Sequence, residues 1–154
     1  MTTIQGNLTK IEKGIIFQCV NAQNCMGSGL AKSLFTKWPK IKNQYHEFCK
    51  GKKHLELLGQ CHFVEINSQL LICNVFGQLF YGNSSMTKER YADYGAIKSA
   101  LSFAQYCIEL NGQDQLPIYF PKLFAADLAG GKAEIIHEII QMFFENAILV
   151  EYKE

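Results

Sequence analysis

The sequence predicts an α/β sandwich built around a mixed β-sheet. Short apolar runs rich in β-branched residues alternate along the chain with longer stretches whose apolar residues recur every three or four positions. The first pattern is typical of buried strands and the second of amphipathic helices, and their alternation indicates a sheet covered by helices. Because the 154 residues contain no internal repeat or linker, we expect one domain spanning residues 1–154.

The N-terminal half supplies the first strand, two helical stretches and a hairpin. Residues 15–20 are an apolar run, and residues 29–38 carry a Leu or Trp at every fourth position. Pro39 ends that helix or starts the next one, which continues the helical face. Residues 60–66 and 69–76 are predicted strands joined by two polar residues, and the second strand is apolar enough to be central.

The C-terminal half continues the alternation with a polar loop, an amphipathic helix, a short strand, a second loop, a helix and a final strand. A stripe of Ile135, Ile139, Met142 and Phe143 marks the last of these helices. In order, the predicted segments are 82–89, 97–111, 116–120, 121–131, 135–143 and 147–152.

Composition and charge exclude several classes of protein. The net charge is +1 and there is neither a basic field nor an acidic tail, so we expect no duplex nucleic acid as partner. The N-terminus lacks the pattern of a signal peptide, and no apolar run is long enough to span a membrane. The six cysteines form no CxxC pair and the four histidines are scattered. We therefore expect a reduced, cytoplasmic protein that needs no metal and no other cofactor.

Two loops leave a strand and enter a helix, and ligands bind at such carboxyl ends in open α/β sheets. The first loop ends in Met26-Gly27-Ser28-Gly29. Its glycines let the backbone approach a ligand, and the helix start offers unpaired N–H groups to a phosphate. The alternative is a plain strand-to-helix turn. The pattern is neither of the common dinucleotide or P-loop fingerprints.

Polar side chains in these loops are the candidates for chemistry. Asn21 and Asn24 follow the first strand. They either contact ribose hydroxyls or an oriented water, or they cap the helix or hold the turn. Asp127 is the only carboxylate of the second loop, and it either acts as a general base or caps the next helix. The pair Gly130-Gly131 could offer further N–H groups to a pyrophosphate.

Several segments together resemble macro domains, and in particular the branch related to ADP-ribose 1''-phosphate phosphatases. The resemblance covers nearly the whole chain and suggests a phage or microbial member of the family. Such a protein is expected in the cytoplasm (the host cytoplasm for a phage protein). It implies a three-layer α/β/α fold with a cleft for ADP-ribose. The segments that carry it are 6–9 (GNLT), 21–31 (NAQNCMGSGLA), 74–78 (NVFGQ), 93–97 (DYGAI) and 128–131 (LAGG).

The resemblance also implies roles for individual residues. Asn7 falls where the family has an Asp that accepts a hydrogen bond from the adenine amino group, with Leu8 beside it. Asn21 and Asn24 fall near the distal ribose, and Gln78 is a further ligand contact. The two phosphate loops correspond to Met26, Gly27, Ser28, Gly29 and Leu30, and to Ala125, Ala126, Asp127, Leu128, Ala129, Gly130 and Gly131.

The chain departs from the family pattern at functional positions. Phe124-Ala125-Ala126-Asp127 replaces a Gly-x-Gly segment, which predicts a stiffer loop. The Lys that some relatives use near Gly77 or Gln78 is missing, so no covalent lysyl intermediate is expected. Gln18 stands where some phosphatase relatives place a His.

Three hypotheses about function follow from the residues and the resemblance. The first is hydrolysis of ADP-ribose 1''-phosphate to ADP-ribose and phosphate, with Asp127, Asn21 and Asn24 around the reacting group. The second is removal of ADP-ribose from modified macromolecules or from an acetyl ester. The third is an ADP-ribose-binding module without turnover. A doubly wound protein for another nucleotide ranks below these.

Overall fold

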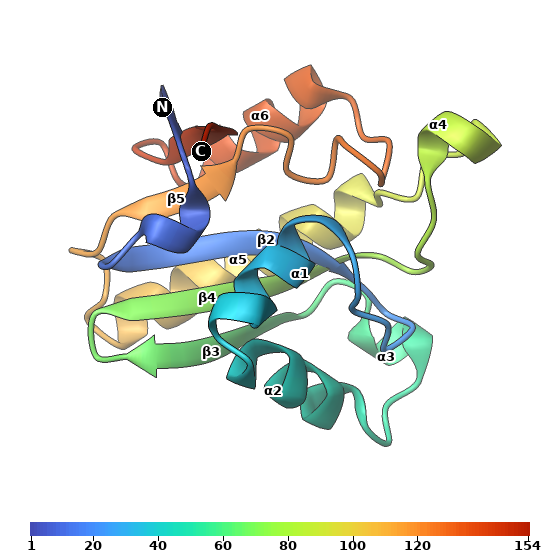
Figure 1. The fold of residues 1–154 in the computed structure, drawn as a ribbon, viewed down its shortest axis with the longest axis horizontal. Helices are drawn as coiled ribbons and strands as arrows, with labels where there is room; N and C mark the ends of the chain where they lie inside the picture. The colour runs from blue at the N-terminus through green and yellow to red at the C-terminus, as the bar shows by residue number, and fades with distance from the viewer.

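A computed structural model describes residues 1–154 and shows a six-stranded mixed sheet with helices on both faces (Figure 1). The strand order is β1-β6-β5-β2-β4-β3; β3 runs antiparallel to β4, and every other neighbouring pair is parallel. The predicted α/β sandwich with a mixed sheet is confirmed. The strands are β1 Thr2–Gly6, β2 Gly14–Asn21, β3 Cys61–Asn67, β4 Leu70–Gln78, β5 Ile118–Pro121 and β6 Ile148–Tyr152.

The helices form an outer layer on each face of the sheet. Helices α1 and α2 cover one face, and α5 covers the other together with α6 (Figure 1). No helix is both long enough and apolar enough to cross a membrane. The bounds are η1 Leu8–Lys10, α1 Gly29–Lys37, α2 Lys40–Cys49, α3 His54–Leu57, α4 Ser84–Thr87, α5 Tyr94–Leu110 and α6 Ala133–Phe143.

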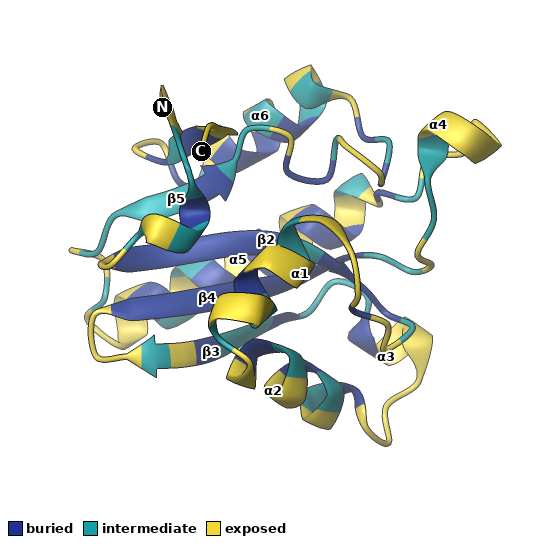
Figure 2. Ribbon diagram, in the orientation of Figure 1, coloured by how far each residue is buried: buried dark blue, intermediate teal, exposed yellow.

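Strand β2 lies in the interior of the molecule and divides its core into two. Successive side chains of a strand point to opposite faces, so Phe17 joins the core under α5 and α6, whereas Ile16 joins the core under α1 and α2. Both are fully buried, and β2 and β4 are buried along almost their whole length (Figure 2). This explains why both strands read as continuous apolar runs in the sequence.

Several features differ from the sequence-based expectations, and three of them bear on the sheet, the loops and the core. Strand β1 was not predicted, because its residues are mostly exposed and only pairing with β6 makes them a strand. The loop predicted at residues 82–89 contains the short helix α4. Met142 was placed on the buried stripe of the last helix but is 61% exposed, and the buried positions of α6 are Ile136, Ile139 and Ile140.

The aromatic cluster under α5 and α6 should dominate stability. The ring of Phe17 stacks on that of Phe120 with 4.5 Å between centroids and lies 5.1 Å from that of Phe144. We expect Phe17→Ala to lower the free energy of unfolding by about 3–5 kcal/mol, through lost burial and the cavity that it leaves. Urea denaturation measures this. Phe103, which is 55% exposed on α5, is the control, and Phe103→Ala should cost less than about 1 kcal/mol. Equal losses in the two variants would contradict this assignment of the core.

Candidate functional site

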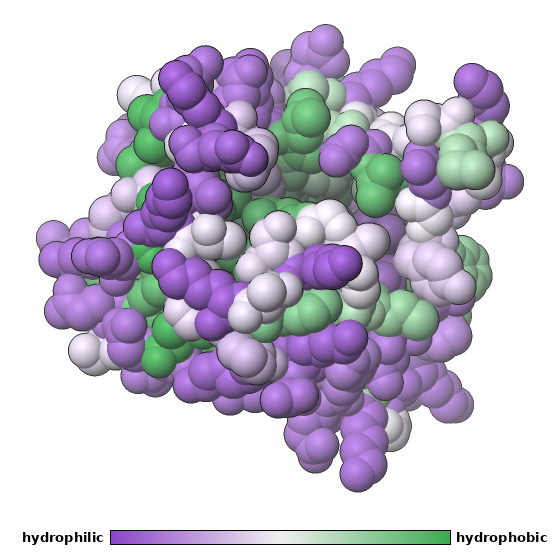
Figure 3. Space-filling model, in the orientation of Figure 1, coloured by the Kyte–Doolittle hydropathy of each residue, from purple (hydrophilic) through white to green (hydrophobic).

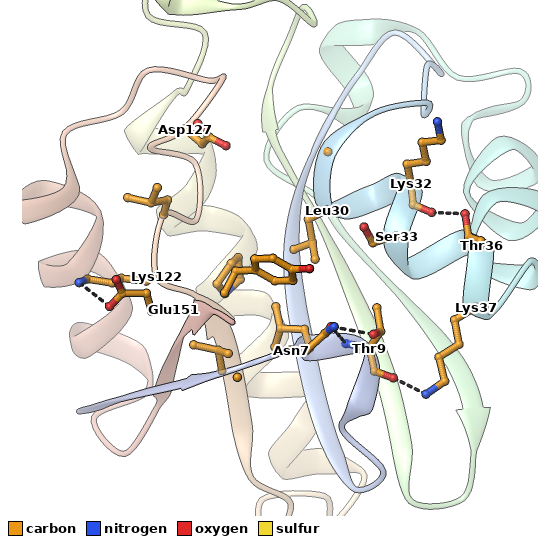
Figure 4. A pocket seen from close by; sticks show the side chains of 17 residues that line it. Asn7, Thr9, Leu30, Lys32, Ser33, Thr36, Lys37, Lys122, Asp127 and Glu151 are labelled. Atoms are coloured by element: carbon orange, nitrogen blue, oxygen red, sulfur yellow. Dashed lines mark hydrogen bonds and ion pairs between the residues drawn. The ribbon is translucent and has the colours of Figure 1, made fainter. Parts of the chain in front are cut away.

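A cleft opens at the carboxyl edge of the sheet because β2 and β5 separate early. Their ladder consists of two residue pairs, Ile15 with Ile118 and Ile16 with Tyr119, while the rest of β2 continues to pair with β4. Beyond this ladder lies a cleft of about 880 Å³ that is visible as a hollow with apolar walls and a polar rim (Figure 3). Its walls come from the ends of β1, β5 and β6 and from helix α1 (Figure 4).

A smaller inner pocket of about 180 Å³ continues the cleft toward β2 and β4. Leu30, Pro121, Leu123 and Asp127 line both spaces, so the two form one elongated site. The inner pocket is also bounded by the start of α1, the second loop and the side chains of Gln18, Cys19 and Gln78. A site of this shape suits an extended ligand with one end in the outer cleft and the other in the inner pocket.

The start of α1 offers unbonded N–H groups to this site. None of the backbone N–H groups of residues 27–31 donates a hydrogen bond within the chain, and the N-cap Ser28 makes no side-chain capping bond. Ser28 lines the inner pocket and Gly29 the outer cleft. Gly29 has φ of 60°, a conformation that glycine adopts without strain. This run of donors lies at the positive end of a helix dipole, an arrangement that favours an anion.

Asn21 shapes the first loop rather than facing the cleft. Its Oδ1 accepts hydrogen bonds from the N–H groups of Gln23 and Cys25 and from the hydroxyl of Tyr45, while its Nδ2 donates to the Cys25 carbonyl oxygen at 2.7 Å. Both polar atoms of the side chain are therefore bonded within the protein, which does not support the expected contact with the distal ribose. Asn24 is exposed, has φ of 60° and contacts His46 Nδ1 through its Oδ1. Neither residue lines the cleft or its inner pocket.

The hydroxyl of Tyr45 anchors this loop from beneath. Tyr45 is fully buried in helix α2, and its hydroxyl donates to the Asn21 carbonyl oxygen at 2.8 Å. Burial raises the pKa of Tyr45 well above its ordinary value, so the hydroxyl keeps its proton and remains a donor. The loop before α1 is thus held by the core of the protein, which fixes the direction of its N–H groups.

The second loop, residues 121–131, contributes different groups from those predicted. The N–H groups of Gly130 and Gly131 donate to the carbonyl oxygens of Asp127 and Ala125, at 3.1 and 2.9 Å, so neither is available to a pyrophosphate. Both glycines are instead required by packing: a Cβ would lie 2.6 Å from the Ser84 Cβ at Gly130 and 2.5 Å from the Ala125 carbonyl oxygen at Gly131. Ala125 has φ of 56°, so it takes a backbone conformation that favours glycine.

Asp127 is the only carboxylate that lines both the cleft and the inner pocket. Its side chain is exposed and accepts no hydrogen bond within the chain. Helix α6 begins at Ala133 with Lys132 as its N-cap, so Asp127 caps no helix. Figure 4 shows it across the cleft from Leu30 and Ser33 of α1. Of the two alternatives left open by the sequence, the geometry favours a carboxylate that faces the site.

The connection between β4 and α5 ties the two loops together. The Tyr81 N–H donates to Gln23 Oε1 of the first loop at 2.9 Å. The Ser84 N–H donates to the Leu128 carbonyl oxygen of the second loop at 3.0 Å, and the Tyr91 and Ala92 N–H groups both donate to Ala129. These bonds close the inner end of the site and fix the distance between its two sides.

A chain of polar side chains crosses the sheet beneath the inner pocket. Gln18 of β2 donates through Nε2 to Asn74 Oδ1 of β4 at 2.7 Å, and Asn74 Nδ2 lies 3.4 Å from His62 Nδ1 of β3. The three are register neighbours on adjacent strands. Burial, followed by the charge of Lys52, lowers the pKa of His62 to about 4, so the imidazole is neutral near pH 7.

Asn7 lines the outer cleft but presents a different group from the one expected. Its Oδ1 accepts hydrogen bonds from the N–H and the hydroxyl of Thr9, at 2.9 and 2.6 Å, which leaves Nδ2 as the free group (Figure 4). Asn7 would therefore donate to a base rather than accept from an adenine amino group. Leu8 lies beside it in the wall, and Gln78 lines the inner pocket.

Sequence reasoning missed other lining residues of the outer cleft. Four of them lie on α1, the helix whose first turn carries the unbonded N–H groups. Glu151 and Tyr152 come from the end of β6. The residues on α1 share polar or basic side chains, a signal that a helical plot of α1 could have revealed. They are Lys32, Ser33, Thr36 and Lys37.

No group of three or more His, Cys, Asp or Glu side chains is placed to hold a metal ion, and all six cysteines are free. Cys19 lines the inner pocket, but burial raises its pKa to about 12, so it remains a thiol. The inner pocket therefore presents backbone N–H groups, one carboxylate and neutral polar side chains.

The chain is similar to known proteins in sequence and in fold. No family model matches the chain. It is 33% identical over 98 residues to an ADP-ribose 1''-phosphate phosphatase of Saccharomyces cerevisiae (strain YJM789), and the match covers 61% of this chain and 55% of that protein. The chain thus matches only about half the length of this curated relative.

Solved structures show the fold. A protein of unknown function from Bacteroides thetaiotaomicron matches with a TM-score of 0.83 at 24% identity over 99% of this chain and 97% of the other. A macrodomain protein from Streptomyces coelicolor matches with a TM-score of 0.74 at 19% identity, over 99% of this chain and 98% of the other. DarTG of Thermosipho africanus, solved in complex with ADP-ribose, matches with a TM-score of 0.70 at 16% identity, over 92% of this chain and 38% of the other. The chain has the macrodomain fold, which confirms the three-layer α/β/α architecture that the resemblance implied.

The lowered pKa of His62 should make stability depend on pH. Between about pH 6.5, the ordinary value, and about pH 4, the unfolded chain binds a proton at His62 that the folded chain does not. The free energy of unfolding should therefore fall as pH drops through this window, by about 1–2 kcal/mol after allowance for solvent around the half-buried ring. Urea denaturation at several pH values compares the wild type with His62→Leu, which should lack this part of the slope. Parallel pH profiles for the two proteins would show that His62 does not titrate in this way.

Proposed function

We propose that this chain binds ADP-ribose or a close derivative along the cleft. The carrying observation is the run of unbonded N–H groups at residues 27–31, which lies where the outer cleft meets the inner pocket. A diphosphate held there would have one nucleoside end in the outer cleft and its other sugar in the inner pocket. The macrodomain fold and the ADP-ribose complex of the DarTG structure support this arrangement.

In this arrangement the outer cleft takes the adenosine. Asn7 donates through its free Nδ2 to a ring nitrogen of the base, and Leu8, Val150 and Tyr152 supply apolar surface. Because Asn7 cannot also accept from the adenine amino group, discrimination against other bases is weaker than an aspartate at this position would give.

The same site supports hydrolysis of ADP-ribose 1''-phosphate to ADP-ribose and phosphate. Asp127 takes a proton from a water whose oxygen attacks the 1''-phosphorus; the bond between phosphorus and the 1''-oxygen breaks, and that oxygen receives the proton from Asp127. The other water proton stays on the released phosphate. The named activity of the yeast relative supports this reaction. The two asparagines of the first loop are left out of the mechanism because they do not line the site.

The alternative with structural support is a binding module without turnover. Asp127 is the only charged side chain in the inner pocket, since Gln18 and Gln78 are neutral and Cys19 is a thiol. The backbone N–H groups at the start of α1 would still bind a diphosphate if all four of these side chains were removed. Removal of ADP-ribose from macromolecules or from an acetyl ester would use the same cleft with a different leaving group.

A substitution at the N-cap of α1 should move stability and affinity in opposite directions. The side chain of Ser28 makes no capping bond, so Ser28→Asp should satisfy N–H groups of the first turn and raise the free energy of unfolding by about 0.5–1 kcal/mol. The same carboxylate would occupy the phosphate donors and repel the ligand. We expect ADP-ribose affinity in calorimetry to fall at least about tenfold.

Ser102→Asp is the matched control, because Ser102 is exposed on α5, on the opposite face of the sheet from α1. It should leave affinity within about twofold. If Ser28→Asp binds ADP-ribose as well as the wild type does, the diphosphate does not lie at this helix start.

Asp127→Asn tests the hydrolysis. The amide keeps the shape of the side chain but cannot accept the proton, so phosphate release from ADP-ribose 1''-phosphate should fall about 10²–10⁴-fold. ADP-ribose binding should change little. Asp114→Asn, an exposed carboxylate outside the cleft, is the control for the charge change. Equal release by Asp127→Asn and the wild type would remove Asp127 from the mechanism.

A further inference from the structure

We propose that Gln18 is a positioning residue that holds the attacking water through its side-chain carbonyl oxygen, and that Asn74 and His62 set the orientation of its amide. This inference rests on the proposed hydrolysis and deepens it. The observation that motivates it is a buried amide at the floor of the inner pocket with one of its two polar atoms unused within the protein.

The exposure of Gln18 shows where its free atom points. The residue is only 2% exposed, and its single hydrogen bond runs from Nε2 to Asn74. No fully buried side-chain nitrogen or oxygen in the chain lacks a partner. The Oε1 atom, which accepts no bond from the protein, must therefore lie on the part of the side chain that is open to the inner pocket.

The two neighbouring strands explain why the oxygen and not the nitrogen faces the pocket. His62 is neutral, and in its tautomer with the proton on Nε2 the Nδ1 atom accepts from Asn74 Nδ2. Asn74 then directs its Oδ1 toward Gln18, where it accepts from Nε2. The orientation of the Asn74 amide thus sets that of the Gln18 amide, and this series of hydrogen bonds ends with Gln18 Oε1, an acceptor, in the pocket. Asn74 is fully buried, which leaves it no alternative partner in solvent.

An uncharged acceptor in this place has a definite use. Gln18 Oε1 and the Asp127 carboxylate line the same inner pocket, one from β2 and the other from the second loop. A water between them would donate one hydrogen to each, with its oxygen lone pairs left for attack on the 1''-phosphorus. Asp127 removes its proton as the new bond forms, while the hydrogen that faces Gln18 stays on the product phosphate. Gln18 aligns the water without changing its protonation.

The test measures kcat for phosphate release and the dissociation constant of ADP-ribose for the wild type and Gln18→Leu. We expect kcat to fall about 10–100-fold while the dissociation constant stays within about threefold, because the lost group contacts water and not the ligand. Gln105→Leu is the matched control. Gln105 donates only to the Phe143 carbonyl oxygen at the α5–α6 interface, and this variant should keep the wild-type kcat.

A second pair of variants tests the orienting chain and covers the case in which Gln18→Leu does not fold. Asn74→Asp still accepts from Gln18 Nε2, whereas Asn74→Leu, of similar size, cannot. We expect Asn74→Asp to retain at least about fivefold more activity than Asn74→Leu. Equal kcat in these two variants would overturn the orienting role.

The remaining outcomes separate this inference from the proposed function. A folded Gln18→Leu with kcat within twofold of the wild type overturns the inference alone. So does a variant in which kcat and affinity fall together, because Gln18 would then contact the ligand itself. Absence of phosphate release from the wild type overturns the hydrolysis itself, and the positioning role falls with it.

Discussion

The short ladder between β2 and β5 determines the geometry of the carboxyl edge of the sheet. After Ile15 and Ile16 have paired with β5, β2 remains attached only to β4. Its last residues then diverge from β5, and the space between the strands becomes the inner pocket. The groups assigned to the diphosphate and to hydrolysis lie around this gap: the start of α1 on one side, residues 121–131 on the other, and Gln18 at the base. A longer β2–β5 ladder would fill this space with paired backbone.

The two sides of the gap differ in their chemistry. The first loop directs N–H groups into the site because Asn21 and Tyr45 hold its backbone from behind. The second loop uses the N–H groups of its glycine pair internally and presents Asp127 instead. One side is thus suited to bind an anion and the other to act on a water. The β4–α5 connection, bonded to both, keeps them at a fixed separation.

Much of this could be predicted from the sequence, and the misses have physical causes. Buried strands such as β2 and β4 reveal themselves as apolar runs, and the start of α1 as a Gly-containing turn. Strand β1 has no such pattern, since its identity comes from pairing with β6 at the other end of the chain. The roles of Asn7 and Asn21 depend on which side-chain atom is already bonded, and no residue pattern encodes that. The polar chain from Gln18 to His62 likewise exists only through strand register.

The central claim is that the N–H groups of residues 27–31 hold the diphosphate of ADP-ribose. Titration of the ¹⁵N-labelled protein with ADP-ribose, followed by amide NMR spectra, observes these groups directly. The account predicts that the amide resonances of residues 27–31 shift most, together with those of the second loop around Asp127, and that α5 and β3 hardly change. Saturable binding that leaves the amides of residues 27–31 unshifted would contradict it.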